Sequence, residues 1–139
     1  MADISITAAN VLPSAAAIIN RNFLAGATIT RGQAVYLDST TNTWKLMDAN
    51  AGATGNELNT TRGIALNDAA SGQVIDVCTR DPDFTPGGTL TNGIAVYASN
   101  TAGGITHDVP TTAAYPTFLG IPKSATKLNL NPTASGAII

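Results

Sequence analysis

The amino-acid sequence predicts an all-β protein, a small sandwich or barrel. Three observations predict it: short runs of alternating apolar and polar residues, frequent turn clusters between these runs, and an internal repeat. The 139-residue chain is long enough for one domain with a moderate core, or for a domain plus an arm. It is too short for two large independent domains.

The strand signals are short and regularly spaced. Ile4 and Ile6 alternate with polar neighbours, and Leu128 and Leu130 do the same near the other end, which is the period-two pattern of half-buried strands. Further short apolar runs and the turn clusters between them complete the pattern of a small sandwich or barrel. The runs are 33–37, 74–78 and 94–97, and the clusters are 38–42, 67–72, 86–88, 92–93 and 103–104.

A repeated sequence word is the most informative feature of the chain. Gly-Gln-Ala-Val-Tyr at 32–36 recurs as Gly-Ile-Ala-Val-Tyr at 93–97, and Gly-Ile-Ala-Leu at 63–66 is answered by Gly-Ile-Pro-Lys at 120–123. The two matches come in the same order, which predicts two similar units at about 29–80 and 90–131. We expect Gly32 and Gly93 to supply the tight bend before a strand, and Tyr36 and Tyr97 to be at least half buried.

A unit of three or four short strands cannot easily bury its own apolar face, so the two units are expected to form one β body at 29–139. Residues 1–28 stand outside the repeat and are interpreted as an extended N-terminal arm. Ser14 is a possible cap for one helical turn over Ala15–Ile19. The arm's apolar residues need another surface, either the protein's own body or a neighbour: Ile4, Ile6, Val11, Leu12, Ile18, Ile19, Phe23 and Leu24.

Composition argues against several classes of partner. Charged residues make up 12% of the chain, the formal net charge is −2, and the seven Lys and Arg residues are scattered singly. Such scatter provides no phosphate-neutralising stripe, which argues against nucleic acid. The apolar stretch Val11 to Ile19 is interrupted by Pro13 and Ser14, which predicts neither an export signal nor a membrane span. A single cysteine excludes an intrachain disulfide, and we expect synthesis in a reducing cytoplasm.

No constellation of residues predicts catalysis, a metal or a cofactor. Cys78 and His107 are the sole cysteine and histidine, and nothing in the sequence brings them together with an orienting group. Asp81-Pro82-Asp83 lacks the Gly and Glu of a calcium loop and is interpreted as a rigid connector between the two units. The few aromatic residues are interpreted as core and interface anchors, with a sugar-binding platform as the minority reading: Tyr36, Trp44, Phe84, Tyr97, Tyr115 and Phe118.

Four segments resemble small capsid decoration, or cement, proteins of tailed bacteriophages: Ile29–Tyr36, Arg62–Val74, Leu90–Tyr97 and Gly103–Ile105. The resemblance extends over about residues 28–131 and more loosely over Ala2–Val11. It implies a β-sandwich or β-tulip-like body, often a homotrimer, on the outer surface of the capsid in the virion. There it would bridge major capsid subunits after assembly in the host cytoplasm. It implies no enzymatic activity.

Two functions follow as alternatives. The first is a capsid decoration protein whose arm binds the capsid through Ile4, Ile6, Val11, Leu12, Ile18 and Ile19, while the arm of the free protein stays mobile. The second is a head or tail fibre module that recognises a host surface receptor. Copy number per virion separates them, since a cement protein is present in many copies and a fibre module in few.

Overall fold

The computed structural model describes residues 3–49, 61–109 and 117–134, and over these residues the protein is all-β, as predicted. They contain ten strands and, as their single helical element, the 3₁₀ turn η1 (Ala8–Asn10). A helical turn at Ala15–Ile19 is not present, because the chain there enters a strand. The strands are β1 (Ile18–Asn20), β2 (Leu24–Ala25), β3 (Ala34–Asp38), β4 (Thr43–Leu46), β5 (Arg62–Ala65), β6 (Val77–Phe84), β7 (Val96–Ala98), β8 (Ile105–Thr106), β9 (Thr117–Pro122) and β10 (Leu128–Ala134).

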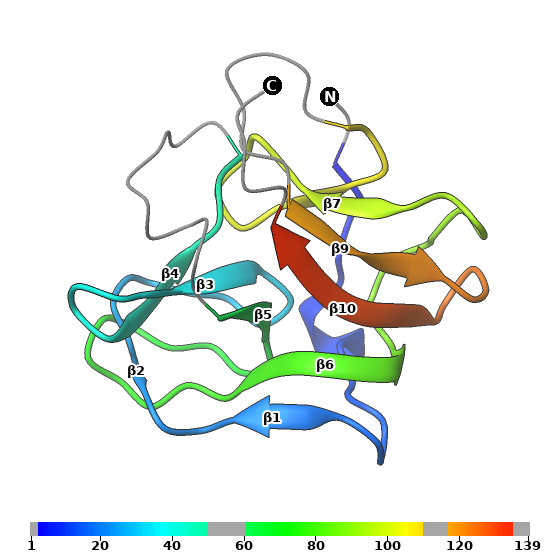
Figure 1. Ribbon diagram of the computed structural model, residues 1–139. Coiled ribbons are helices and arrows are strands. Elements are labelled where there is room, and N and C mark those ends of the chain that lie inside the picture. Colours follow the sequence, from blue (N-terminus) through cyan, green and yellow to red (C-terminus); the bar gives the residue numbers. More distant parts are fainter. Residues whose placement is uncertain (1–2, 50–60, 110–116, 135–139) are drawn as a thin grey trace.

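The strands form one continuous sheet in the order β2-β4-β3-β5-β6-β10-β9-β7-β8, with β1 pairing with β6 (Figure 1). The sheet curls, and backbone hydrogen bonds join its two halves away from the β6–β10 contact. Gly103 N–H donates to Met47 O at 2.7 Å, and Ala49 N–H donates to Ser99 O at 3.0 Å. The segment after β4 thereby meets the turn between β7 and β8.

The two halves of the sheet have the same strand order. Read from one end it is β4-β3-β5-β6, and read from the other it is β8-β7-β9-β10. The pairing also agrees at one position of each repeat, because Val35 pairs with Gly63 and the aligned Val96 pairs with Gly120. Gly32 and Gly93 both have positive φ, 96° and 79°, ahead of their strands. This is the arrangement that a two-unit repeat requires, although 50–60 and 110–116 lie outside the described residues.

The two units turn opposite faces toward the shared interior. Tyr36 is 8% exposed and belongs to the main core, whereas Tyr97 lies off that core and makes an edge-to-face contact with Phe118, at 6.1 Å between ring centroids. A register irregularity between Val96 and Tyr97 accompanies the difference. Accordingly Val96 lies in the main core, whereas the aligned Val35 lies in the second apolar cluster of the protein.

The interior consists of two apolar clusters. The main core fills the curl of the sheet with residues from both units, including Tyr36, Ile64, Leu119 and Leu128. The second cluster is built around Trp44 on the other side of the first unit, where Ile29, Ala69 and Ile75 pack against it. The first unit is therefore buried on both faces.

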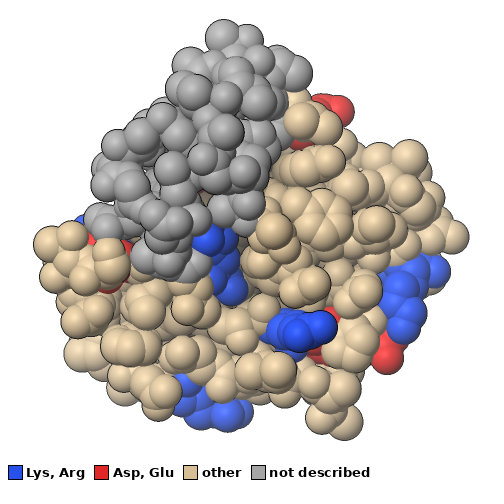
Figure 2. Space-filling view, viewed as in Figure 1, with Lys and Arg blue, Asp and Glu red and all other residues tan. Residues whose placement is uncertain are grey.

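The face of the molecule seen in Figure 2 carries few charged residues. Figure 2 shows a few isolated blue and red residues on a broad neutral face, in keeping with the scattered Lys and Arg of the sequence. Among the described residues no helix is long and apolar enough to cross a membrane.

Candidate binding surface: the N-terminal strap

Residues 3–20, called the strap below, do not form a free arm. Figure 1 shows the N-terminal segment running past the body and then along β6 as β1. Ile4 N–H donates to Ile105 O at 2.8 Å, and Thr7 N–H donates to Gly87 O at 2.8 Å. Further along, Leu12 and Thr85 exchange two backbone hydrogen bonds of 2.9 Å each. The strap therefore lies on the protein's own body, one of the two surfaces that the sequence left open, and is not an arm standing away from it, because the body offers it backbone partners along its length.

Glycines in the body make room for the strap. A Cβ on Gly88 would lie 2.4 Å from Ser5 O, and one on Gly87 would lie 2.7 Å from Thr7 O. Gly32 leaves space in the same way for Ile6 and Val11, whose methyl groups would lie 2.8 and 2.9 Å from its Cβ. The sequence predicted these glycines only as turn formers, so their second role was missed.

Polar side chains fasten the strap at three points. The fully buried Asp81 accepts a hydrogen bond from Ser14 N at 2.6 Å and another from Ser14 Oγ. Arg31 donates from its guanidinium to Val11 O, and Ser99 Oγ donates to Asp3. Hydrogen bonds to charged groups are roughly twice as strong as neutral ones, so these contacts strengthen the backbone pairing.

The structure also corrects the prediction of a rigid connector at 81–83. Asp81-Pro82-Asp83 lies inside β6, where Asp83 N–H donates to Asp81 at 2.9 Å. Pro82 is tolerated at this place in a strand because it occurs where the pairing is irregular. Asp81 therefore holds the strap from within a strand that pairs with both halves of the sheet, and it is not part of a separate connector.

The strap's apolar residues divide between the body's core and solvent. Val11 is 0% exposed within the main core, and Ile4 and Ile6 pack against that core, so these three predicted capsid-binding residues bind the protein's own body. Ile19 is half-buried beside Cys78. Leu12 and Ile18 are 53% and 57% exposed and remain available to a partner.

The exposed pair lies along the outer edge of the strap. Leu12 is opposite Thr85 and Ile18 is opposite Arg80, so both follow β6 on the side away from β5 and β10. β1 pairs with β6 on one side, and no described strand pairs with its other side. We call Leu12, Ile18 and this unpaired side of β1 the strap edge. Next to it, Arg21 forms an ion pair of 3.5 Å with Asp76.

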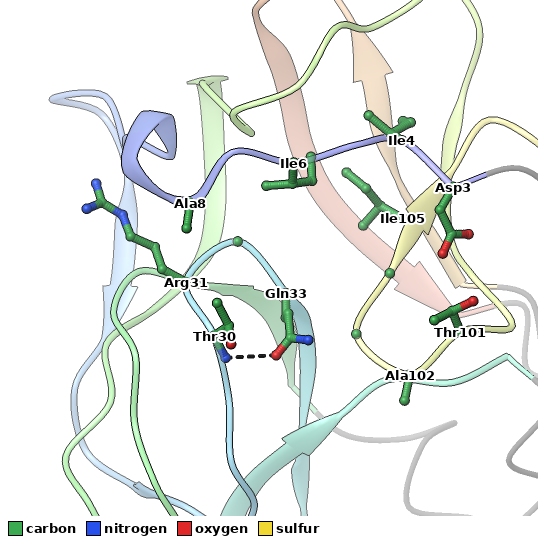
Figure 3. Close-up of a pocket in the computed structure, with 13 residues that line it drawn as sticks. Asp3, Ile4, Ile6, Ala8, Thr30, Arg31, Gln33, Thr101, Ala102 and Ile105 are labelled. Atoms are coloured by element: carbon green, nitrogen blue, oxygen red, sulfur yellow. Dashed lines mark hydrogen bonds between the residues drawn. The ribbon is translucent and has the colours of Figure 1, made fainter.

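A cavity of about 300 Å³ lies between the first part of the strap and two loops (Figure 3). Ile4, Ile6 and Ile105 line one part of the cavity. Thr30 and Gln33 line another part, and there Thr30 N–H donates a hydrogen bond to Gln33 Oε1 at 2.8 Å. The guanidinium of Arg31 points away from the cavity toward η1. The residues that line this cavity include no histidine and no cysteine.

Cys78 and His107 each have a structural place. Burial raises the pKa of the Cys78 thiol to about 12, which keeps it in the unreactive thiol form at neutral pH. The His107 ring accepts a hydrogen bond from Thr91 N at 3.0 Å and contacts Ile94 O at 3.1 Å, so it fastens the turn before β7. Within the described residues no group of three His, Cys, Asp or Glu could hold a metal ion.

The aromatic residues do not assemble into a sugar-binding platform in the described part of the chain. Trp44 and Phe84 are fully buried, Tyr36 is in the main core, and Tyr97 pairs with Phe118. Tyr115 lies outside the described residues. Comparison with protein families finds no family model that matches the chain, and no curated protein matches it either.

Proposed function

We propose that this chain is a non-enzymatic capsid decoration protein that binds the outer surface of a phage head and stabilises contacts between major capsid subunits. The observation that carries the proposal is the strap edge, where Leu12 and Ile18 are more than half exposed on an otherwise docked segment. The resemblance of the repeat segments to cement proteins supports the same class. The virion surface is accordingly the proposed location.

The strap edge suits attachment to a shell. Burying a large aliphatic side chain contributes about 1.5–3 kcal/mol, so the two exposed residues provide a modest contact. An unpaired strand side also accepts an extended segment from a partner, with main-chain hydrogen bonds giving affinity. Repeated over a lattice, many modest contacts stabilise the assembled state, because they bind the shell and not free subunits.

The low charge of the surface is compatible with this task. Arg21 and Asp76, which lie beside the strap edge, form an ion pair with each other. A partner that covers them therefore does not leave either charge buried without its counter-ion. We also propose that the protein associates with copies of itself, as a homotrimer on the particle.

The test uses undecorated heads and two matched double variants. Leu12→Ser with Ile18→Ser removes the exposed side chains of the strap edge. Ile94→Ser with Ile121→Ser removes two side chains of similar exposure, 49% and 48%, which lie before β7 and in β9. We expect the first variant to lose at least about tenfold in affinity for heads, and the second to bind as the wild type does.

Equal binding by both variants would contradict the assignment of the strap edge. Densitometry of purified particles tests the function itself, since a decoration protein is present in many copies on the head. A few copies per particle would overturn the decoration role and favour the fibre module that recognises a host receptor.

A further inference from the structure

The contacts that hold the strap do not depend on the strap's covalent connection. Ser14 and Asp81 are 67 positions apart in sequence, and Asp3 and Ser99 are 96 apart. The connection itself is Arg21–Phe23, between β1 and β2, and Arg21 and Asn22 are exposed. Beyond it, Gly26 N–H donates to Trp44 O at 2.7 Å, which ties the following chain to β4. The body surface that holds the strap is called the slot below, and it consists of β6 with Asp81, of Thr85, and of Gly32, Gly87 and Gly88. The strap and the slot are thus two complementary surfaces joined by a short exposed link.

An empty slot would be unfavourable. Asp81, 0% exposed, would lose the two hydrogen bonds that it accepts from Ser14 and keep the one from Asp83. A buried acceptor left without its donors is destabilising, and more so when it is charged. The first residues of β6, Val77 to Arg80, and Thr85 just after the strand would also lose the strap as a backbone partner. A body whose strap has left therefore needs another occupant.

The occupant must match the slot's chemistry. It needs a backbone N–H and a hydroxyl opposite Asp81, an aliphatic side chain at the position of Val11 between Gly32 and Gly87, and an extended backbone alongside β6. A segment with these features at this spacing is the strap of a second copy. We propose that the slot accepts the strap of a neighbouring copy, so that adjacent molecules exchange residues 3–20 and become interlocked.

Exchange preserves the contacts between strap and slot, because every slot still holds a strap. A high local concentration of neighbouring copies favours the exchanged form. The length of the link sets the geometry. With three residues between β1 and β2, the two bodies must lie next to each other. The proposal goes beyond decoration, since it concerns how copies join one another and not what they bind.

Cross-chain disulfides report the exchange. Leu12 and Thr85 are directly opposite across two hydrogen bonds, an arrangement with Cα atoms about 5.5 Å apart, within disulfide range. One chain would carry Leu12→Cys and a differently tagged chain Thr85→Cys. After the two are unfolded and refolded together at high concentration and then oxidised, we expect a cross-chain disulfide whose yield rises with concentration. Cys78 does not compete, because it is buried.

Two controls make the outcome decisive. A chain with both Leu12→Cys and Thr85→Cys must close on itself at low concentration, which shows that the pair can bond. If it does not, Ile18→Cys with Arg80→Cys takes its place, since these exposed residues are also in register. A mixture of Leu12→Cys with Ser71→Cys, an exposed residue, measures random collision. Cross-chain yield no higher than in that mixture, with a competent pair, overturns the exchange and leaves capsid binding untouched.

Discussion

Gly63 and Gly120 occupy the same place in the two halves of the sheet. Each pairs with the valine of its unit's Ala-Val-Tyr word, and each lies against the backbone of the next strand. A Cβ on Gly63 would be 2.3 Å from Cys78 O, and one on Gly120 would be 2.1 Å from Asn129 O. The repeated glycine therefore allows close approach of neighbouring strands in both units.

Replacing either glycine with alanine is expected to destabilise the fold strongly. The clash is with backbone, which cannot move aside as a side chain can, so we expect each substitution to lower the free energy of unfolding by about 3 kcal/mol or more. Gly72→Ala is the control, because its Cβ meets nothing within 4 Å and costs only the strain of a positive φ. Urea denaturation measures all three. A loss at Gly63 and Gly120 no larger than at Gly72 would contradict the packing argument.

Ser14→Ala tests the attachment of the strap to Asp81. The variant keeps the backbone donor but removes the hydroxyl, so we expect the free energy of unfolding to fall by about 1.5–3 kcal/mol. Hydrogen exchange should accelerate most at amides of β1. Ser71→Ala, at an exposed turn, should leave both quantities unchanged. Wild-type exchange rates in β1 of the Ser14 variant would show that the contact is dispensable.

Deleting residues 2–20 is expected to leave a poorly folded body. The deletion removes Val11 from the main core and the backbone partners of β6. We expect the truncated protein to have a lower thermal midpoint than the full chain and to bind a hydrophobic dye that the full chain does not bind. Circular dichroism and dye fluorescence provide the measurement. A truncated protein that melts at the wild-type temperature would show that the body folds without the strap.

Asp38 and Lys45 are expected to make stability depend on pH. The hydrogen bond from Lys45 lowers the pKa of the Asp38 carboxyl, with further help from Thr40 N–H. A carboxyl whose pKa is lower in the folded state stabilises the fold above its unfolded pKa and loses that contribution as pH falls through the folded value. We expect Lys45→Met to reduce the difference in thermal midpoint between pH 7 and pH 3.

Lys123→Met is the comparison for that prediction. Lys123 also lowers the pKa of a partner, Asp83, but this pair is about half exposed on both sides. Solvent screens exposed pairs, so the pH profile should change less than with Lys45→Met. A larger change at Lys123 would mean that burial around Asp38 does not strengthen its pair.

Light scattering tests self-association. We expect the free protein at high concentration, or the protein on capsids, to be an oligomer, with a trimer as the specific prediction. The unpaired side of β1 is the exposed strand edge that motivates it. A strictly monomeric protein in both conditions would remove the prediction.

The sequence alone determined the class of the fold and its internal order. Period-two runs and turn glycines depend on neighbours in the chain, so strands such as Ala34–Asp38 and Leu128–Ala134 could be expected from local pattern. The repeated sequence segments have the same strand order in both halves, because in each unit a glycine turn precedes a strand and a second glycine allows the neighbouring strand to approach closely.

Only the tertiary structure decided where the strap lies and which of its residues remain exposed. Val11 and Leu12 are adjacent and both apolar, yet one is fully buried and the other is half exposed. The difference arises from Gly32 and Gly87, which are distant in sequence and together open a space for Val11. In the same way, nothing near Asp81 indicated that Ser14 would be its partner. Contacts between such distant segments depend on how the sheet curls, and local patterns carry no information about that curvature.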